Sequence, residues 1–118
     1  MAQNINSITA NGLFNSGEFG LTALTENSFS TDVSGCKDPI TVIVDTTSDK
    51  SKAHTLVCLG ADGKKDKEIK LGVGTMNAIR ITTTGFKKND GFIDFSIEGG
   101  ASAGIKVAFL KYVPVVNN

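Results

Sequence analysis

The sequence has no tryptophan, one histidine, one arginine (Arg80) and only two prolines among its 118 residues. Lysine plus arginine and aspartate plus glutamate both number 12, so the formal net charge is zero. Proteins that rely on phosphate contacts usually carry a basic excess. We therefore expect no direct binding to nucleic acid.

Long apolar segments are also missing. No apolar run approaches the roughly 20 residues that a membrane-spanning helix needs, so we expect no membrane partner. The first eight residues lack the basic region and apolar core of a secretory signal. We expect the chain to be made in the cytoplasm. Cys36 and Cys58 could pair, but in a chain that is not exported we expect free thiols.

Alternation of apolar and polar residues is the main signal that is present. In residues 105–113, Ile105, Val107 and Phe109 share one face of an extended chain, while Ala108 and Leu110 share the other. A strand that is apolar on both faces is typical of the middle of a packed β structure. Weaker alternation predicts one or two strands within residues 21–31. Further strands are predicted at residues 40–46, 53–59, 68–73, 76–83 and 92–98, with loops at 32–39 and 60–67.

No segment shows a sustained apolar stripe with the period of a helix. Short strands with turns at regular spacing predict an all-β fold: a single antiparallel β-sandwich or jelly-roll-like barrel over residues 21–118. Residues 1–20 are polar with scattered apolar side chains, and we interpret them as an extended N-terminal arm. A disordered terminus is the alternative. Deleting residues 1–20 is expected to leave a folded β domain.

Five apolar residues of this arm are the candidate interface. They are Ile5, Ile8, Leu13, Phe14 and Phe19. A merely disordered tail would not need them, so we expect them to dock on a partner.

Residues 100–104 match the pattern G-x-S-x-G of serine hydrolases. In those enzymes a helix follows the serine, and an acid and a histidine come later in the chain. Here a predicted strand follows Ser102, and the sole histidine, His54, precedes it. We expect a small-residue hairpin loop, and we do not expect the protein to be an enzyme.

Candidate metal and nucleotide motifs are equally incomplete. His54 and Cys58 share a face of a predicted strand but would stand about 13 Å apart, too far to ligate one zinc ion. Gly72 and Gly74 lack the third glycine and the helix of a dinucleotide-binding fingerprint. We therefore expect no catalytic, metal or cofactor site.

From Ile40 onward the order of elements resembles that of a known family. The stretches that carry the resemblance are Ile40 to Val44, Thr55 to Gly60, Ile69 to Gly74, Ala78 to Ile81, Gly85 to Gly91, Ile93 to Gly99 and Ile105 to Leu110. They resemble small virion proteins of tailed bacteriophages that decorate the capsid exterior. In that family a similar Phe-Lys element and polar turn precede two final strands ending in Val-Ala-x-Leu.

The resemblance implies a structural role in the virion. Such a protein binds the outer surface of the shell of major capsid subunits, beside neighbouring copies of itself, and stabilises the shell against internal DNA pressure. The family has no catalytic residues to carry over. A tail or baseplate component is an alternative. A carbohydrate-binding β-sandwich module is another, although it would need exposed tryptophan or tyrosine platforms, and this chain has no tryptophan and one tyrosine, Tyr112.

Overall fold

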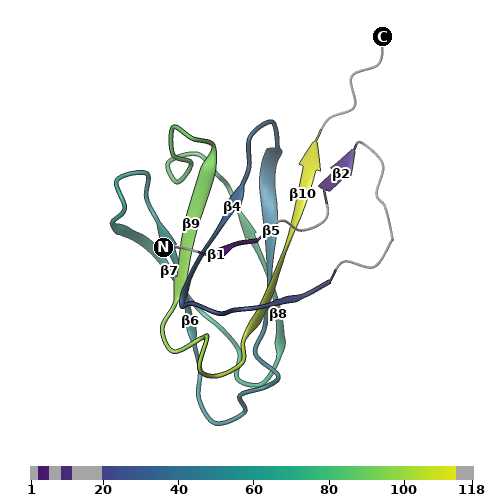
Figure 1. The fold of residues 1–118 in the computed structure, drawn as a ribbon, viewed down its shortest axis with the longest axis vertical. Helices are drawn as coiled ribbons and strands as arrows, with labels where there is room; N and C mark the ends of the chain where they lie inside the picture. The colour runs from purple at the N-terminus through teal and green to yellow at the C-terminus, as the bar shows by residue number, and fades with distance from the viewer. Residues whose placement is uncertain (1–2, 6–8, 12–19, 114–118) are drawn as a thin grey trace.

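The computed structural model describes residues 3–5, 9–11 and 20–113, and these form ten β-strands and no helix (Figure 1). Sheet A has the strand order β1-β4-β9-β6-β7, and sheet B has the order β2-β10-β5-β8, with β3 also paired to β10. The strands are β1 (Gln3–Asn4), β2 (Thr9–Asn11), β3 (Thr22–Ala23), β4 (Ser28–Asp32), β5 (Lys37–Asp45), β6 (Thr55–Leu59), β7 (Lys65–Lys70), β8 (Met76–Ile81), β9 (Phe92–Ile97) and β10 (Lys106–Val113). The prediction of an all-β fold is confirmed.

The core lies between the two sheets and is built around three phenylalanines. Phe29 of β4 and Phe95 of β9 come from sheet A, and Phe109 of β10 comes from sheet B. The ring centroid of Phe95 lies 5.5 Å from the ring centroid of Phe29 and 5.5 Å from that of Phe109. The centroids of Phe29 and Phe109 lie 6.0 Å apart. All three side chains are buried. Two antiparallel-rich sheets packed through such contacts are consistent with a β-sandwich.

Strand β10 occupies the middle of sheet B, as the two apolar faces of its sequence predict. One side of β10 pairs with β5, and its other side pairs with β3 near Lys106 and with β2 near Lys111. Val107 and Phe109 point into the core, and Ala108, on the opposite face, is also buried.

Two strands begin inside segments that the sequence predicted to be loops. β7 begins at Lys65, inside the expected charged loop, because it is an edge strand whose exposed residues can all be charged. β5 begins at Lys37 and includes Pro39. The register with β10 shifts there, so that Tyr112 lies opposite Lys37. A proline, which lacks an N–H, is compatible with such an irregularity.

Part of the expected N-terminal arm belongs to the sheets. β1 pairs in parallel with β4, and β2 pairs in parallel with β10 (purple strands beside β4 and yellow β10 in Figure 1). The Gln3 amide ties β1 to the segment around β3, because its Nε2 donates to the Ala23 carbonyl (3.1 Å) and its Oε1 accepts from the Thr25 N–H (2.7 Å).

The prediction that Ile5 belongs to the candidate interface is wrong. Its side chain is only 2% exposed and belongs to the core of its own chain, and its N–H donates to the Ser30 carbonyl (2.8 Å). Ile5 is thus unavailable to a partner in this fold. The sequence pattern did not reveal this because two-residue pairing with β4 depends on tertiary contacts.

Candidate interaction surfaces

The other four candidate interface residues, Ile8, Leu13, Phe14 and Phe19, lie outside the described residues. The remaining candidate features are therefore the buried polar groups, the hollows and the exposed apolar side chains of residues 20–113.

His54 is a buried structural residue immediately before β6. Its Nε2 lies 2.8 Å from Asp49 Oδ2, and its Nδ1 lies 3.3 Å from the Glu98 carbonyl oxygen. Hydrogen bonds from the Ser51 side chain and backbone, together with the His54 contact, hold the pKa of Asp49 well below its usual range. His54 thus connects the loop after β5 to the end of β9. The part of the chain that the structure describes contains no group of three or more His, Cys, Asp or Glu side chains placed to hold a metal ion.

Lys111 is a buried residue that the sequence analysis did not single out. Its side chain is 4% exposed, and its Nζ donates to Thr31 Oγ1 and to the Asp32 carbonyl, both at 2.9 Å. Burial lowers the pKa of Lys111. The sequence does contain a signal for this burial. Lys111 continues the alternation of Val107 and Phe109, which places its side chain on the inward face of β10.

Ser102 lies in the turn between β9 and β10, and its hydroxyl donates to the Gly99 carbonyl at 3.0 Å. A strand follows this turn, as predicted, but the expected hairpin loop is wrong, because β9 belongs to sheet A and β10 to sheet B. This hydrogen bond gives Ser102 a local role in the turn.

The two cysteines are free thiols in different places. Cys36 is half-buried in the loop before β5, and Cys58 is buried in β6. Burial raises the pKa of the Cys58 thiol from 9.0 to about 11. This shift makes the stability of the fold sensitive to alkaline pH.

We expect the free energy of unfolding to fall as pH rises from about 9 to about 11, because the unfolded chain then loses its Cys58 proton while the folded chain keeps it. The loss should reach about 2–3 kcal/mol at 1.36 kcal/mol per pKa unit. Denaturant unfolding in reducing buffer at several pH values measures it. Cys58→Ala should remove this part of the pH dependence, and Cys36→Ser should retain it. An unchanged slope in Cys58→Ala would contradict the assignment.

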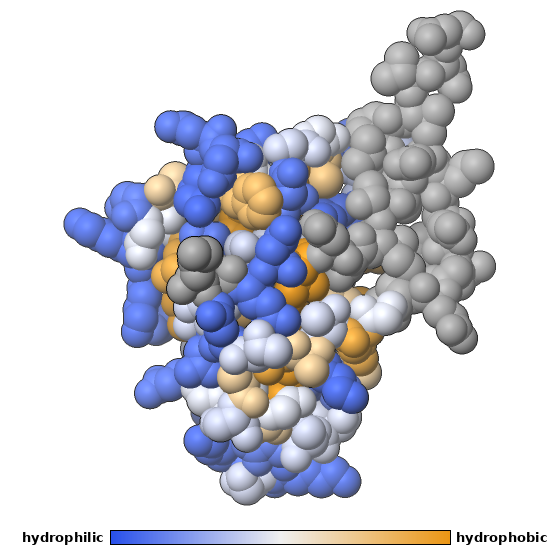
Figure 2. All heavy atoms as spheres, viewed as in Figure 1, coloured by the Kyte–Doolittle hydropathy of each residue, from blue (hydrophilic) through white to orange (hydrophobic). Residues whose placement is uncertain are grey.

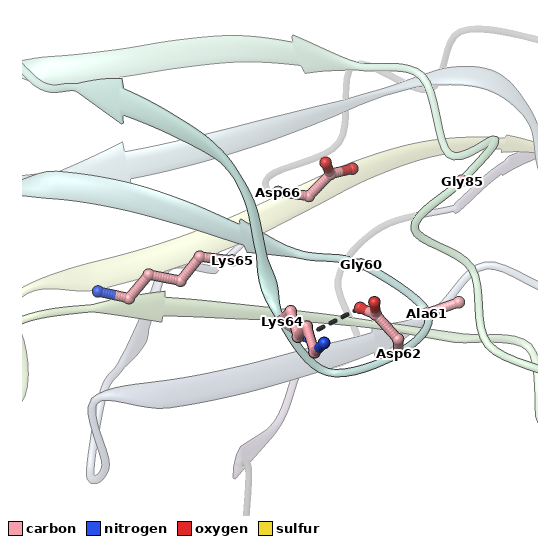
Figure 3. A pocket seen from close by; sticks show the side chains of 7 residues that line it. All are labelled: Gly60, Ala61, Asp62, Lys64, Lys65, Asp66 and Gly85. Carbon is pink, nitrogen blue, oxygen red and sulfur yellow. Dashed lines mark hydrogen bonds between the residues drawn. The ribbon is translucent and has the colours of Figure 1, made fainter.

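The hollows in the described surface are shallow and polar. One, of about 450 Å³, lies beside the β6–β7 turn and is lined by Gly60, Ala61, Asp62, Lys64, Lys65, Asp66 and Gly85 (Figure 3). Asp62 Oδ1 accepts from the Lys64 N–H at 3.0 Å, which shapes this turn, and the Lys65 side chain extends away from it. A second, of about 430 Å³, is lined by Asn27, Thr55, Val57, Lys65, Glu68, Ser96 and Glu98. Neither hollow is lined by an aromatic side chain, so neither offers a stacking platform for a sugar ring.

The outer face of sheet B carries more apolar side chains than these hollows. The register places Ala108, Ile43 and Ala78 in one row across β10, β5 and β8. Met76 at the start of β8 is 56% exposed, and Tyr112 near the end of β10 is 40% exposed. Figure 2 shows one face of the molecule, on which hydrophilic residues predominate with apolar residues between them.

The described residues include no helix that is long and apolar enough to cross a membrane. Comparison with known proteins found no match to a protein-family model, a curated protein or a solved structure.

Proposed function

We propose that this chain is a capsid decoration protein of a tailed bacteriophage, which binds the outer surface of the major capsid shell and stabilises it. One observation carries the proposal: the stretches that resemble this family, from Ile40 to Leu110, follow one another through β5 to β10 and their turns within two packed sheets. The resemblance therefore concerns a continuous structural unit. The protein acts by binding, as a non-catalytic component of the virion exterior made in the host cytoplasm.

A jelly-roll-like closure of the two sheets and an extended N-terminal arm belong to this proposal. Two residues anchor the arm: Gln3 pairs with Phe29 of β4 and donates from its side chain to the Ala23 carbonyl, and Ile5 is buried in the core. Ile8, Leu13, Phe14 and Phe19 are the residues of the arm that remain as candidates for contact with the capsid. Anchoring one end of a segment reduces the entropy that the segment loses when it docks.

Many weak contacts would suffice for such a protein. Copies on one shell have a high effective concentration with respect to their binding sites and to one another, so modest contacts combine into strong attachment. The partners in this proposal are the major capsid protein and neighbouring copies of the chain. The formal net charge of zero limits long-range repulsion between copies.

We expect the triple substitution Leu13→Ser, Phe14→Ser and Phe19→Ser to weaken attachment to undecorated capsids by at least about tenfold. Each apolar side chain that is buried at an interface contributes about 1.5–3 kcal/mol, and ordering the segment offsets part of this. Co-sedimentation of the purified protein with undecorated capsids measures the change. Circular dichroism and thermal unfolding of the variant serve as the check that any loss of attachment does not come from unfolding.

The matched control is Lys64→Ser with Lys65→Ser, on the exposed turn at the β6–β7 hollow, which should attach like the wild type. Equal attachment of the triple variant and the wild type would remove these arm residues from the mechanism. If the wild-type protein does not attach to capsids at all, the decoration proposal is refuted, and binding to isolated tails would instead support a tail component.

A further inference from the structure

Among the described residues, strand β8 forms an open sheet edge without the usual protection. It has six residues, of which only Arg80 is charged, and it pairs with β5 in a regular register. Within the described part of the chain, β5 is the only strand paired with β8. The edge strand β7 has the same length but carries five charged residues and a register shift, and the edge strands β1, β2 and β3 have only two or three residues. Charge, irregular pairing and short length all discourage edge-to-edge pairing.

The register identifies the backbone groups that this edge presents. Directly beyond β5 and β8, the Thr46 N–H donates to the Thr75 carbonyl at 2.9 Å, and the Thr75 N–H donates to Thr46 Oγ1 at 3.0 Å. These two residues therefore occupy a hydrogen-bonded position that continues the β5–β8 ladder. Hydrogen-bonded and non-hydrogen-bonded pairs alternate along an antiparallel ladder. The N–H and C=O groups of Met76, Ala78 and Arg80 therefore point away from β5. Among the described residues, no turn, loop or side chain provides these groups with a hydrogen bond.

We propose that β8 pairs in antiparallel fashion with β8 of a second copy, joining two sheets B into one continuous sheet. Ala78 lies on the two-fold axis, opposite Ala78 of the second copy, and Met76 lies opposite Arg80 of the second copy. In this register the outward N–H and C=O groups of all three residues find partners. The proposal rests on the geometry of this edge and is independent of the capsid assignment.

Charge complementarity favours a second copy as the occupant. Asp45 lies directly opposite Met76 on β5, so the order across the joined sheet is Asp45, Met76, then Arg80 of the second copy. Two strand spacings separate the outer residues by about 10 Å between Cα atoms, a distance that an extended arginine and an aspartate can bridge. In the single chain Arg80 forms no ion pair among the described residues. Because the dimer is symmetric, the contact between Arg80 of one copy and Asp45 of the other occurs twice.

Apolar contacts also fit this arrangement. The row formed by Ala108, Ile43 and Ala78 continues across the axis into the same row of the second copy. The arginine side chain would cover Met76, the most exposed of the large hydrophobic residues in the described chain. The small Ala78 side chains at the axis allow the two backbones to approach.

Sedimentation velocity of the full chain over a range of concentrations tests the proposal, and we expect a reversible dimer. Ala78→Pro should raise its dissociation constant by at least about tenfold, because it removes two symmetric hydrogen bonds. The lost N–H points away from β5, so the β5 ladder keeps its hydrogen bonds. Ala78→Lys should act similarly by placing like charges opposite each other. Ala78→Val, a good strand former, is the matched control and should retain the dimer.

Amide hydrogen exchange by NMR locates the contact. The Met76, Ala78 and Arg80 amides should become protected as concentration rises, whereas the amides of β7 should not change. A monomer at all concentrations up to about 1 mM, a dimer that resists both Ala78→Pro and Ala78→Lys, or protection confined to another strand would each overturn the proposal. If Ala78→Pro fails to fold, Ala78→Lys decides, since its side chain lies on the exposed face.

Discussion

Replacing Phe109 by alanine should lower the free energy of unfolding by about 3–5 kcal/mol, the range for removal of a buried aromatic side chain. Phe109 is the contribution of sheet B to the three-ring cluster, and its centroid lies 5.5 Å from Phe95 and 6.0 Å from Phe29. The alanine would leave a cavity lined by both remaining rings. The surrounding strands are held by ladders on both sides, so the cavity cannot collapse freely. Denaturant unfolding followed by circular dichroism measures the loss.

Tyr112→Ala is the matched control on the same strand. Tyr112 is 40% exposed on the outer face of sheet B, so the change should cost far less than the change at Phe109. A loss below about 1 kcal/mol for Phe109→Ala would contradict the central role of the cluster, because surface substitutions typically fall in that range.

Ile5→Ala should lower the free energy of unfolding by about 2–4 kcal/mol, since isoleucine truncation in a core costs the transfer energy plus a cavity. Deleting residues 1–20 should cost more, because it also removes β1, β2 and the two hydrogen bonds of Gln3. This revises the expectation that the truncated chain folds normally. Thermal and urea unfolding of both variants measure the losses.

Asn4→Ala is the neighbouring control, because Asn4 is exposed on the outer face of β1. It should leave stability nearly unchanged. Ile5→Ala with the stability of the wild type would show that residues 3–5 do not contribute to the core.

Alternation alone was enough to predict most strands of this chain. The strand at residues 92–98 is β9, and its apolar residues Ile93, Phe95 and Ile97 are all buried. Predictions failed where the sheet environment, and not the residue pattern, decides the structure. β7 can be highly charged because it is an edge strand. β1 has only two residues, and it forms because β4 and the contacts of the Gln3 side chain hold it in place. Neither cause is visible in a local sequence window.

The candidate surfaces were harder to predict than the strands. Ile5 was expected to contact a partner because of its apolar character, yet it lies in the core. Burial of Ile5 depends on the parallel pairing of β1, which no local pattern indicates. The open edge of β8 could not be recognised either, because strand order decides whether Met76, Ala78 and Arg80 have backbone partners. Lys111 was not singled out in the sequence, because its partners Thr31 and Asp32 lie about 80 residues earlier in the chain.

The position of β10 has a consequence for synthesis. β10 is the last strand of the described chain, yet it lies between β5 on one side and β2 and β3 on the other. A ribosome adds about 5–20 residues per second, so β5 emerges several seconds before the strand that must cover its open side. During that interval Ile40, Val42 and Val44 have no complete core to enter. β5 can pair with β8 earlier, but sheet B is completed only when β10 has been made. The nascent chain therefore needs protection from aggregation until residues 106–113 have been made.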